Sequence, residues 1–335
     1  MLTDKILGMD LGTRTIKVSL LNKGKSVEIK DMALRQTPEG SVFEGQIKEI
    51  DPIAAILKKM LADKKFGTKN LAITINSPYA VVREFTVPAL KDNEIAPAVE
   101  YDLSQTFPNI ADTHYLSVKV YNRSAESVRG VVCFCPKKIV DDYYELAKKC
   151  GLKLRYVDVH ANSIAKAFST FITSQMPNDP VLVADIGFKS SQVIAMLGSK
   201  IILCRYFSGG GISVDNLVAD HLKVPLDKAE LYRKRGYAGL EISKEEMDAY
   251  IRLGYAAIEE QMRQTIDFCT YNKFKNGIKH IFLMGGGSIF PGIEKYFTET
   301  FNIPATMIKP LDQKGINKDM FINMLPAIGS ALRED

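Results

Sequence analysis

The chain has 335 residues, of which 46% are hydrophobic and 25% are charged, and it carries a formal net charge of +5. A single hydrophobic core stops growing at roughly 250–300 residues, so we expect two lobes with separate cores. No block of Lys and Arg stands out, which argues against a nucleic-acid partner, and no apolar run approaches the ~20 residues that span a bilayer.

The sequence pattern contains no sign of a structural metal or of secretion. The five cysteines match no zinc spacing, and the four histidines form no ligand cluster. Residues 1–5 lead directly into a predicted strand, without the cleavage site of a signal peptide. We therefore expect a cytoplasmic protein.

Residues 6–20 predict two strands around a tight turn that suits a triphosphate and its metal. In this turn, Gly12 lets the backbone approach phosphates, Thr13 offers a hydroxyl and amides, and Lys17 offers a positive charge. Asp10 offers a carboxylate to water on Mg²⁺. The structural alternative is that the same D-x-G-T pattern merely closes an ordinary hairpin.

The following segment predicts an α/β layer, because strands, a helix and further strands succeed one another. Asp51-Pro52 is typical of a helix start, with an N-cap followed by proline at the first helical position. We expect the strand over 81–87 to pair beside the strand over 71–75. The elements predicted in this layer are strands over 27–34, 71–75 and 81–87 and the helix that starts at Asp51.

The next unit has a different character, and we interpret it as a small inserted subdomain. Its order is helix, two strands and helix, with Gly151 ending the second helix. The predicted elements are helices over 90–103 and 138–150 and strands over 115–121 and 127–134.

The opening pattern recurs about half the chain later. Residues 181–196 again predict a strand, a D-x-G turn with hydroxyls and a strand, and this turn holds Asp185, Gly187 and Ser190. Such an internal repeat indicates two related lobes, each with a phosphate-gripping hairpin. The elements expected before it are a strand over 154–159, a helix over 161–173 and a linker at 178–180.

Two glycine runs complete the pattern. The run Gly209, Gly210 and Gly211 opens a predicted helix over 213–222, whose first amides suit a phosphate; a flexible connector is the alternative. The run from Gly285 to Ser288 follows a predicted strand and also leads into a helix. The other elements expected here are a helix over 244–273 capped by Ser243 with Glu246, strands over 279–284 and 303–308, and a last helix over 323–332.

These four turns, in this order, resemble the actin/Hsp70/sugar-kinase superfamily. The resemblance implies an α/β, two-lobed actin-like ATPase fold with duplicated ribonuclease-H-like lobes, and it implies ATP and Mg²⁺ as cofactors. It assigns Asp10 and Asp185 to Mg²⁺ through water, Gly285 to Ser288 to adenosine, and 327–331 to a connecting helix. The residues implied in ATP binding are Asp10, Gly12, Thr13, Arg14, Lys17, Asp185, Gly187, Ser190, Gly209, Gly210, Gly211, Glu230, Arg233, Gly285, Gly286, Gly287 and Ser288.

An insert after the 81–87 strand resembles the arrangement in the FtsA and PilM families, and the motifs Gly8–Thr13, Val157–Val159, Ala184–Gly187 and Leu325–Arg333 favour PilM. The PilM resemblance implies a cytoplasmic scaffold of type IV pilus or type II secretion assembly. The implied partner is the N-terminal tail of a PilN-like inner-membrane protein, bound in a groove that involves the insert. Further candidate partners are other assembly-platform components, including the assembly ATPase, and a second copy of the chain.

The sequence departs from its relatives at His160-Ala161, where they commonly have Glu-Pro. An imidazole then replaces an acid near the hydrolytic water, and a positioned base is worth roughly 10²–10⁴-fold in rate. We therefore expect ATP binding with slow or no hydrolysis, with Asp158, His160 and Asp185 as the catalytic candidates. The alternative is that His160 only caps the next helix.

Two other functions stay open. An FtsA-like cell-division filament protein usually ends in a basic amphipathic helix, whereas this sequence stops at Arg333–Asp335, which argues against direct membrane anchoring. We expect recruitment to the inner face of the membrane by partners instead. A small-molecule kinase needs a polar substrate pocket, and no Asn/Asp/Glu cluster stands beside the phosphate turns.

The expected division is lobe 1 at 1–87 and 154–178, the insert at 88–153, lobe 2 at 179–212 and 279–317, a helical subdomain at 213–278 and the connecting helix at 318–335.

Overall fold

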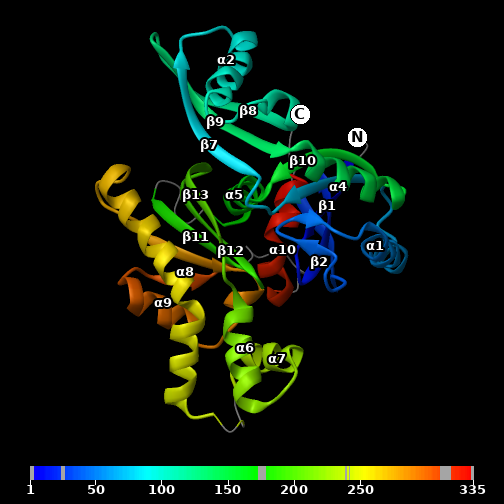
Figure 1. The fold of residues 1–335 in the computed structure, drawn as a ribbon, viewed down its shortest axis with the longest axis vertical. Coiled ribbons are helices and arrows are strands. Elements are labelled where there is room, and N and C mark those ends of the chain that lie inside the picture. The colour runs from blue at the N-terminus through cyan, green and yellow to red at the C-terminus, as the bar shows by residue number, and fades with distance from the viewer. Residues whose placement is uncertain are drawn as a thin grey trace.

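Two five-stranded sheets with the same strand arrangement organise the chain (Figure 1). The computed structural model describes residues 4–23, 27–172, 179–237, 240, 242–309 and 318–332. In spatial order, the first sheet contains β10 (Lys153–Val159), β6 (Asn70–Ile75), β1 (Asp4–Leu11), β2 (Thr15–Lys23) and β3 (Val27–Gln36). The second contains β15 (Ala305–Met307), β14 (His280–Met284), β11 (Pro180–Ile186), β12 (Ser190–Leu197) and β13 (Lys200–Ser208).

The pairing pattern confirms the duplication. In the first lobe β1 is antiparallel to β2 and parallel to β6, and in the second β11 is antiparallel to β12 and parallel to β14. The central strands are buried on both faces, which explains why they read as near-continuous apolar runs. The two-lobed α/β fold with duplicated ribonuclease-H-like lobes is therefore the fold of this chain.

The first lobe also contains the short hairpin β4 (Val42–Phe43) and β5 (Gln46–Ile47) and the helices α1 (Ile50–Lys64), α4 (Lys137–Lys149) and α5 (His160–Phe171). The second contains α6 (Gly211–Leu222), α7 (Leu226–Arg235), α8 (Lys244–Asn272), α9 (Ile293–Phe301) and a 3₁₀ turn at Gly286–Ser288; α10 (Lys318–Ser330) follows it in the chain and packs on the first sheet. The Ser243 hydroxyl accepts a hydrogen bond from the Glu246 amide at the start of α8, so the predicted cap is confirmed.

Two helices pack between the lobes: α5 contacts strands of both sheets, and α10 contacts β1 and β2 of the first sheet. Helices α5 and α10 lie side by side between the two sheets (Figure 1), and they share one hydrophobic cluster that includes Ile6 and Leu21 of the first sheet and Val183 of the second. The contact is tight: a Cβ at Gly329 would lie 1.7 Å from the backbone oxygen of Ser163. The α5–α10 contact is therefore the seam that joins the lobes.

Helix α10 starts at Lys318, five residues before the predicted start, and Pro326 lies inside it. A proline cannot donate to the carbonyl four residues earlier, here that of Ile322. That carbonyl instead accepts a hydrogen bond of 3.3 Å from the amide of Gly285. The proline thus frees an acceptor that ties α10 to the glycine turn after β14.

A third sheet forms the insert, with β7 (Val81–Pro88), β9 (Ser127–Pro136) and β8 (His114–Arg123) in spatial order. Helices α2 (Asp92–Ser104) and α3 (Ile110–Thr113) belong to it. The expectation that 81–87 pairs beside 71–75 is wrong, because all of β7 pairs with β9. Strand propensity specifies an extended backbone but not the partner strand.

Helix α4 packs its buried side on the first lobe, in one cluster with α1 and β1, although we expected it in the insert. With the pairing of β7, this contact favours insert limits of 81–136. The seven-segment division stays a prediction, and its boundaries at 178/179 and 317/318 touch residues outside the described ones. Met1, Asn178 and Arg333–Asp335, which carried other expectations, also lie outside them.

Candidate functional site

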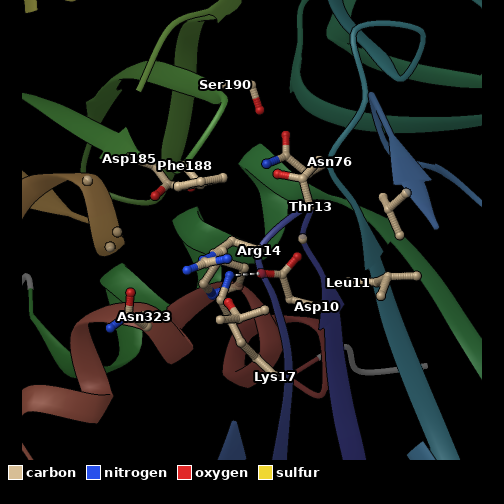
Figure 2. Close-up of a pocket in the computed structure, with 18 of the residues that line it drawn as sticks. Asp10, Leu11, Thr13, Arg14, Lys17, Asn76, Asp185, Phe188, Ser190 and Asn323 are labelled. Atoms are coloured by element: carbon tan, nitrogen blue, oxygen red, sulfur yellow. Dashed lines mark hydrogen bonds and ion pairs between the residues drawn. The ribbon is translucent and has the colours of Figure 1, made fainter. Parts of the chain in front are cut away.

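The predicted turns meet at a cleft between the lobes (Figure 2). It encloses about 930 Å³, including open solvent at its mouth. The β1–β2 turn, the β11–β12 turn, the start of α5, α7, the glycine turn after β14 and α10 all contribute to it. The predicted residues that line it are Asp10, Gly12, Thr13, Arg14, Lys17, Asp185, Gly187, Ser190, Glu230, Arg233, Gly285, Gly286, Gly287 and His160.

Asp10 and Lys17 form an ion pair on the floor of the cleft. They face one another in the β1–β2 pairing, and Lys17 Nζ lies 2.5 Å from Asp10 Oδ2 (Figure 2). Burial by itself would lower the pKa of Lys17, but Asp10 and Asp185 outweigh it, so this pKa lies above its ordinary value. Lys17 therefore presents a fixed positive charge to the cleft.

His160, at the start of α5, connects the two repeated turns. Its Nε2 lies 2.7 Å from Asp185 Oδ2, and its Nδ1 lies 3.9 Å from Asp10 Oδ1. Both side chains of the longer contact are 2% exposed. Within the part of the chain that the structure describes, neither Asp10 Oδ1 nor His160 Nδ1 has a hydrogen-bond partner. Buried polar atoms are rarely left unpaired, so this point of the cleft fits a polar ligand or water.

The glycine turns pack backbone against backbone. Gly285 has a φ of 86°, and a Cβ there would lie 2.3 Å from Asp185 Oδ1, so only glycine brings this turn onto the β11–β12 turn. Gly210 is equally close: a Cβ there would lie 2.5 Å from the Gly187 oxygen. The close approach explains why glycines recur in these turns.

The start of α6 supports the second turn from outside the cleft. The amides of Gly209, Gly211 and Ile212 donate to the carbonyls of the β11–β12 turn at about 3.0 Å. Among the described residues, the lining of the cleft does not include Gly209, Gly210, Gly211 or Ser288. Their assignment to ATP stays a prediction, and their observed hydrogen bonds are with other groups of the protein, such as the Ser191 hydroxyl that donates to the Gly209 carbonyl at 2.7 Å.

Arg233 holds the glycine turn after β14. Its side chain is 1% exposed, and its Nε lies 2.6 Å from Asp215 Oδ1. Its Nη1 donates to three carbonyls of the turn, those of Gly286, Gly287 and Ile289, at 3.1–3.2 Å. Burial raises the pKa of Asp215, and Arg233 offsets only part of that shift. Most of the guanidinium is thus used to shape the cleft wall.

Arg14 reaches across the cleft to residues of the other lobe. Its Nη2 lies 2.6 Å from Glu230 Oε2 on α7, and its guanidinium lies 5.0 Å from the centre of the Phe188 ring. Lys234 approaches the other oxygen of Glu230 at 2.6 Å. Burial would raise the pKa of Glu230, but Lys234 and Arg14 outweigh it and hold the pKa below its ordinary value. Glu230 is therefore an ionised acceptor between two cations.

Asp158 takes no part in lining the cleft. Its oxygens accept from the Val159 amide and from the side chains of Asn162 and Ser163, and its Oδ2 forms an ion pair with Lys166 Nζ at 2.8 Å. These contacts fix the first turns of α5. Of the three catalytic candidates, the structure brings together His160 and Asp185 and leaves Asp158 apart.

The sequence matches the family described as "Type IV pilus assembly protein PilM" over residues 8–332, which is nearly the whole chain. The chain belongs to this PilM family. The family match confirms the resemblance drawn from the four turns and the inserted unit, and it makes type IV pilus assembly the setting of this chain.

Solved structures agree with the fold of this PilM-family chain. The structure titled "PilM-PilN type IV pilus biogenesis complex" has a TM-score of 0.85 and 20% identity, covering 98% of both chains. MreB5 of Spiroplasma citri bound to ADP has a TM-score of 0.57 and 14% identity, covering 98% of this chain and 96% of that one. At these identities the likeness establishes the actin-like fold.

A curated relative is the cell division protein FtsA of Borreliella burgdorferi. It is 26% identical over an alignment of 198 residues, and the match covers 52% of this chain and 46% of the FtsA chain. The PilM-family chain thus spans about half the length of this relative.

Several lining residues were missed in the sequence. Asn76 directly follows the buried strand β6, and a polar residue at the carboxyl end of such a strand is a usable signal. Phe188 follows Gly187 in the second turn and passed unnoticed because it is apolar. The other missed residues are Leu11, Thr15, Leu34, Val42, Glu44, Gly45, Tyr206, Lys234, Asn323 and Pro326.

Proposed function

We propose that this PilM-family chain binds ATP with Mg²⁺ in the interlobe cleft and, with its lobes set by the nucleotide, holds the N-terminal tail of a PilN-like membrane protein. The observation that carries the nucleotide part is the buried, unpartnered Asp10 Oδ1, which lies beside the cationic Lys17 in a glycine-lined cleft. A buried acceptor of this kind favours a ligand that supplies hydrogen-bond donors, such as metal-bound water.

The residues present fit ATP and Mg²⁺. Lys17 and the β1–β2 turn would hold phosphate, and the β11–β12 turn would hold it from the other lobe. Over the described ranges, no three His, Cys, Asp or Glu side chains form a group that would hold a metal ion directly. Mg²⁺ commonly keeps several waters and takes phosphate oxygens, so Asp10 and Asp185 would hold it through water. MreB5, which has the same fold, was crystallised with ADP.

We expect ATP hydrolysis to be slow or absent. Asp158 accepts hydrogen bonds from the first turns of α5 and does not line the cleft. His160 uses its Nε2 in a hydrogen bond with Asp185. It occupies the position at which similar proteins commonly have an acidic residue. With an imidazole in place of that acid, the chain lacks a carboxylate base at this position, and such a base is worth a factor of roughly 10²–10⁴ in rate. ATP would then act mainly as a structural ligand.

The partner is proposed from the family and from the PilM in complex with PilN, which shares this fold. The insert offers a three-stranded sheet whose outer strands, β7 and β8, have free edges in that sheet, and an extended peptide adds to such edges. Among the described helices, none has both the length and the apolar character to cross a membrane. We therefore propose that the PilN-like tail brings the chain to the inner face of the cytoplasmic membrane.

The test measures Mg-ATP binding by calorimetry and by thermal shift, with Asp10→Ala as the variant. Asp31→Ala is the matched control, because Asp31 pairs with Lys64 on the surface and lies away from the cleft. We expect Asp10→Ala to lose ATP binding while both variants stay folded. Gly286→Val should also lose binding, because a Cβ there meets only the end of Asn323, at 3.3 Å, and its side chain would enter the cleft.

The partner is tested by a pull-down with N-terminal tails of inner-membrane pilus proteins, with and without Mg-ATP. We expect a PilN-like tail to be retained, and retained better with ATP. A folded wild-type chain that binds no Mg-ATP overturns the nucleotide part, and failure of every tail in both states overturns the partner part.

The partial FtsA match favours a second candidate, a cell-division filament protein. This function predicts ATP-dependent polymers that pellet on centrifugation and bind liposomes. Soluble chain after centrifugation with ATP, together with tail binding, would decide for the pilus scaffold.

A further inference from the structure

The contact between Arg14 and Glu230 joins two elements that are 216 positions apart in the sequence. Arg14 belongs to the β1–β2 turn of the first lobe, and Glu230 belongs to α7 of the second. Both line the cleft, and their side chains are 26% and 10% exposed. An ion pair with this much burial is screened less than a surface pair.

Arg14 also lies where a phosphate between the two repeated turns would meet it. It follows Thr13 in the first turn and stands over Phe188 of the second turn, and Figure 2 shows these side chains facing one another across the cleft. Two of its donors, Nε and Nη2, approach the same oxygen of Glu230 at 2.9 and 2.6 Å. An anionic phosphate and the Glu230 carboxylate therefore compete for one guanidinium.

Glu230 is held from both sides. Its second oxygen accepts from Lys234, one helical turn further along α7. The carboxylate stays ionised, because Lys234 and Arg14 hold its pKa below the ordinary value. Loss of Arg14 to a phosphate would leave Glu230 with one cation and would remove a direct link between the first lobe and α7.

We propose that Arg14 is a switch between the lobes: its pairing with Glu230 latches the β1–β2 turn to α7, and a polyphosphate chain entering the cleft takes over Arg14 and releases α7. This inference rests on the proposed function, because it assigns a role to Arg14 in the same cleft. It adds that phosphate binding and the Arg14–Glu230 pair exclude one another.

The experiment is a double-mutant cycle with inorganic tripolyphosphate, which has no ribose or base that Glu230 could contact. Calorimetry gives its dissociation constant for wild type, Arg14→Ala, Glu230→Gln and the double variant. We expect Glu230→Gln to tighten binding about three- to tenfold and Arg14→Ala to weaken it about tenfold or more. In the Arg14→Ala background, Glu230→Gln should give no more gain than Glu44→Gln, because Arg14 is then no longer there to be released.

Glu44→Gln is the matched control, because Glu44 lines the same cleft but its Oε2 accepts from Tyr79 and not from Arg14. Glu44→Gln only removes a negative charge from the cleft, so it should change the dissociation constant of tripolyphosphate by the same factor in the wild-type and Arg14→Ala backgrounds. As a second measurement, hydrogen exchange of the α7 amides should rise when tripolyphosphate is added to wild type and should not change in Arg14→Ala.

The outcomes separate the two proposals. An equal gain from Glu230→Gln in both backgrounds, or no gain in either, overturns the latch, and Mg-ATP binding by the wild type then leaves the proposed function standing. If folded wild type and Glu230→Gln bind neither Mg-ATP nor tripolyphosphate, the proposed function fails and the latch fails with it.

Discussion

Replacing Gly329 with alanine tests whether the α5–α10 seam sets the stability of the whole chain. The added Cβ would lie 1.7 Å from the oxygen and 2.4 Å from the carbon of the Ser163 carbonyl, whereas Cβ atoms essentially never come closer than 3.0 Å to such atoms. Both elements are helical backbone, so neither atom yields by a side-chain rotation. The helices must therefore separate by at least 1.3 Å, the difference between 3.0 and 1.7 Å.

The magnitude follows from two opposing effects. Overpacking of this kind costs about 3 kcal/mol or more, because the seam between the lobes opens along its length. Alanine regains about 1 kcal/mol over glycine within a helix. The free energy of unfolding should therefore fall by about 2 kcal/mol, or more. At roughly 2.1 cal/mol/K per residue, 335 residues unfold with about 0.7 kcal/mol/K, so Tm should fall by about 3 °C.

Calorimetry and urea unfolding measure this effect, with Gly286→Ala as the control. The control makes the same chemical change, but its Cβ meets only the flexible end of Asn323 at 3.3 Å. We expect the control to unfold within about 1 °C of wild type. Equal unfolding temperatures for Gly329→Ala and the control would refute the reasoning, because the seam would then accommodate a methyl group without opening.

Three further predictions concern the charges around the cleft. Asp215→Ala leaves the Arg233 guanidinium buried without its carboxylate, so the free energy of unfolding should fall by about 3–5 kcal/mol in urea; an unchanged midpoint would contradict it. Because the pKa of Glu230 is lowered in the folded chain, its ionised form stabilises the fold above the ordinary carboxyl pKa, and this contribution is lost as pH falls through the lowered value. The free energy of unfolding of wild type, relative to that of Glu230→Gln, should therefore decrease from about pH 6 to about pH 3.5. A difference that is constant with pH would show that Lys234 and Arg14 do not lower the pKa of Glu230. Lys17 keeps its charge because its pKa is raised, so Lys17→Met should weaken Mg-ATP binding about tenfold or more, and wild-type affinity should show no change from Lys17 titration between about pH 7 and pH 9.

Local signals in the sequence were enough for the repeated hairpins and the glycine turns. The strands on either side of Gly12 and of Gly187 are neighbours in the chain, so their pairing depends on a short turn and an apolar pattern that can be read directly. The two copies then indicated two related lobes, and the sheets have the same strand arrangement. The cap of α8 at Ser243 is similarly local.

Long-range pairing needed the tertiary structure. The apolar pattern of residues 81–87 specifies a strand equally well in two sheets, and only the packed fold places it against β9. Helix α4 has a strongly amphipathic pattern, but that pattern does not say which core its apolar side joins. Arg233 looked like a ligand contact, and only its burial against Asp215 and three carbonyls shows that it supports the turn.

The sequence by itself determined the kind of protein: two copies of a strand-turn-strand unit, an insert and the residues that suit phosphate. The tertiary structure alone decided which of these residues meet. Asp158 and His160 are two positions apart, yet one fixes the start of α5 and the other faces Asp185 in the cleft. Arg14 and Glu230 are 216 positions apart, yet they form one ion pair. Hydrogen bonds and ion pairs act over a few ångströms of space, and distance along the chain does not measure that space.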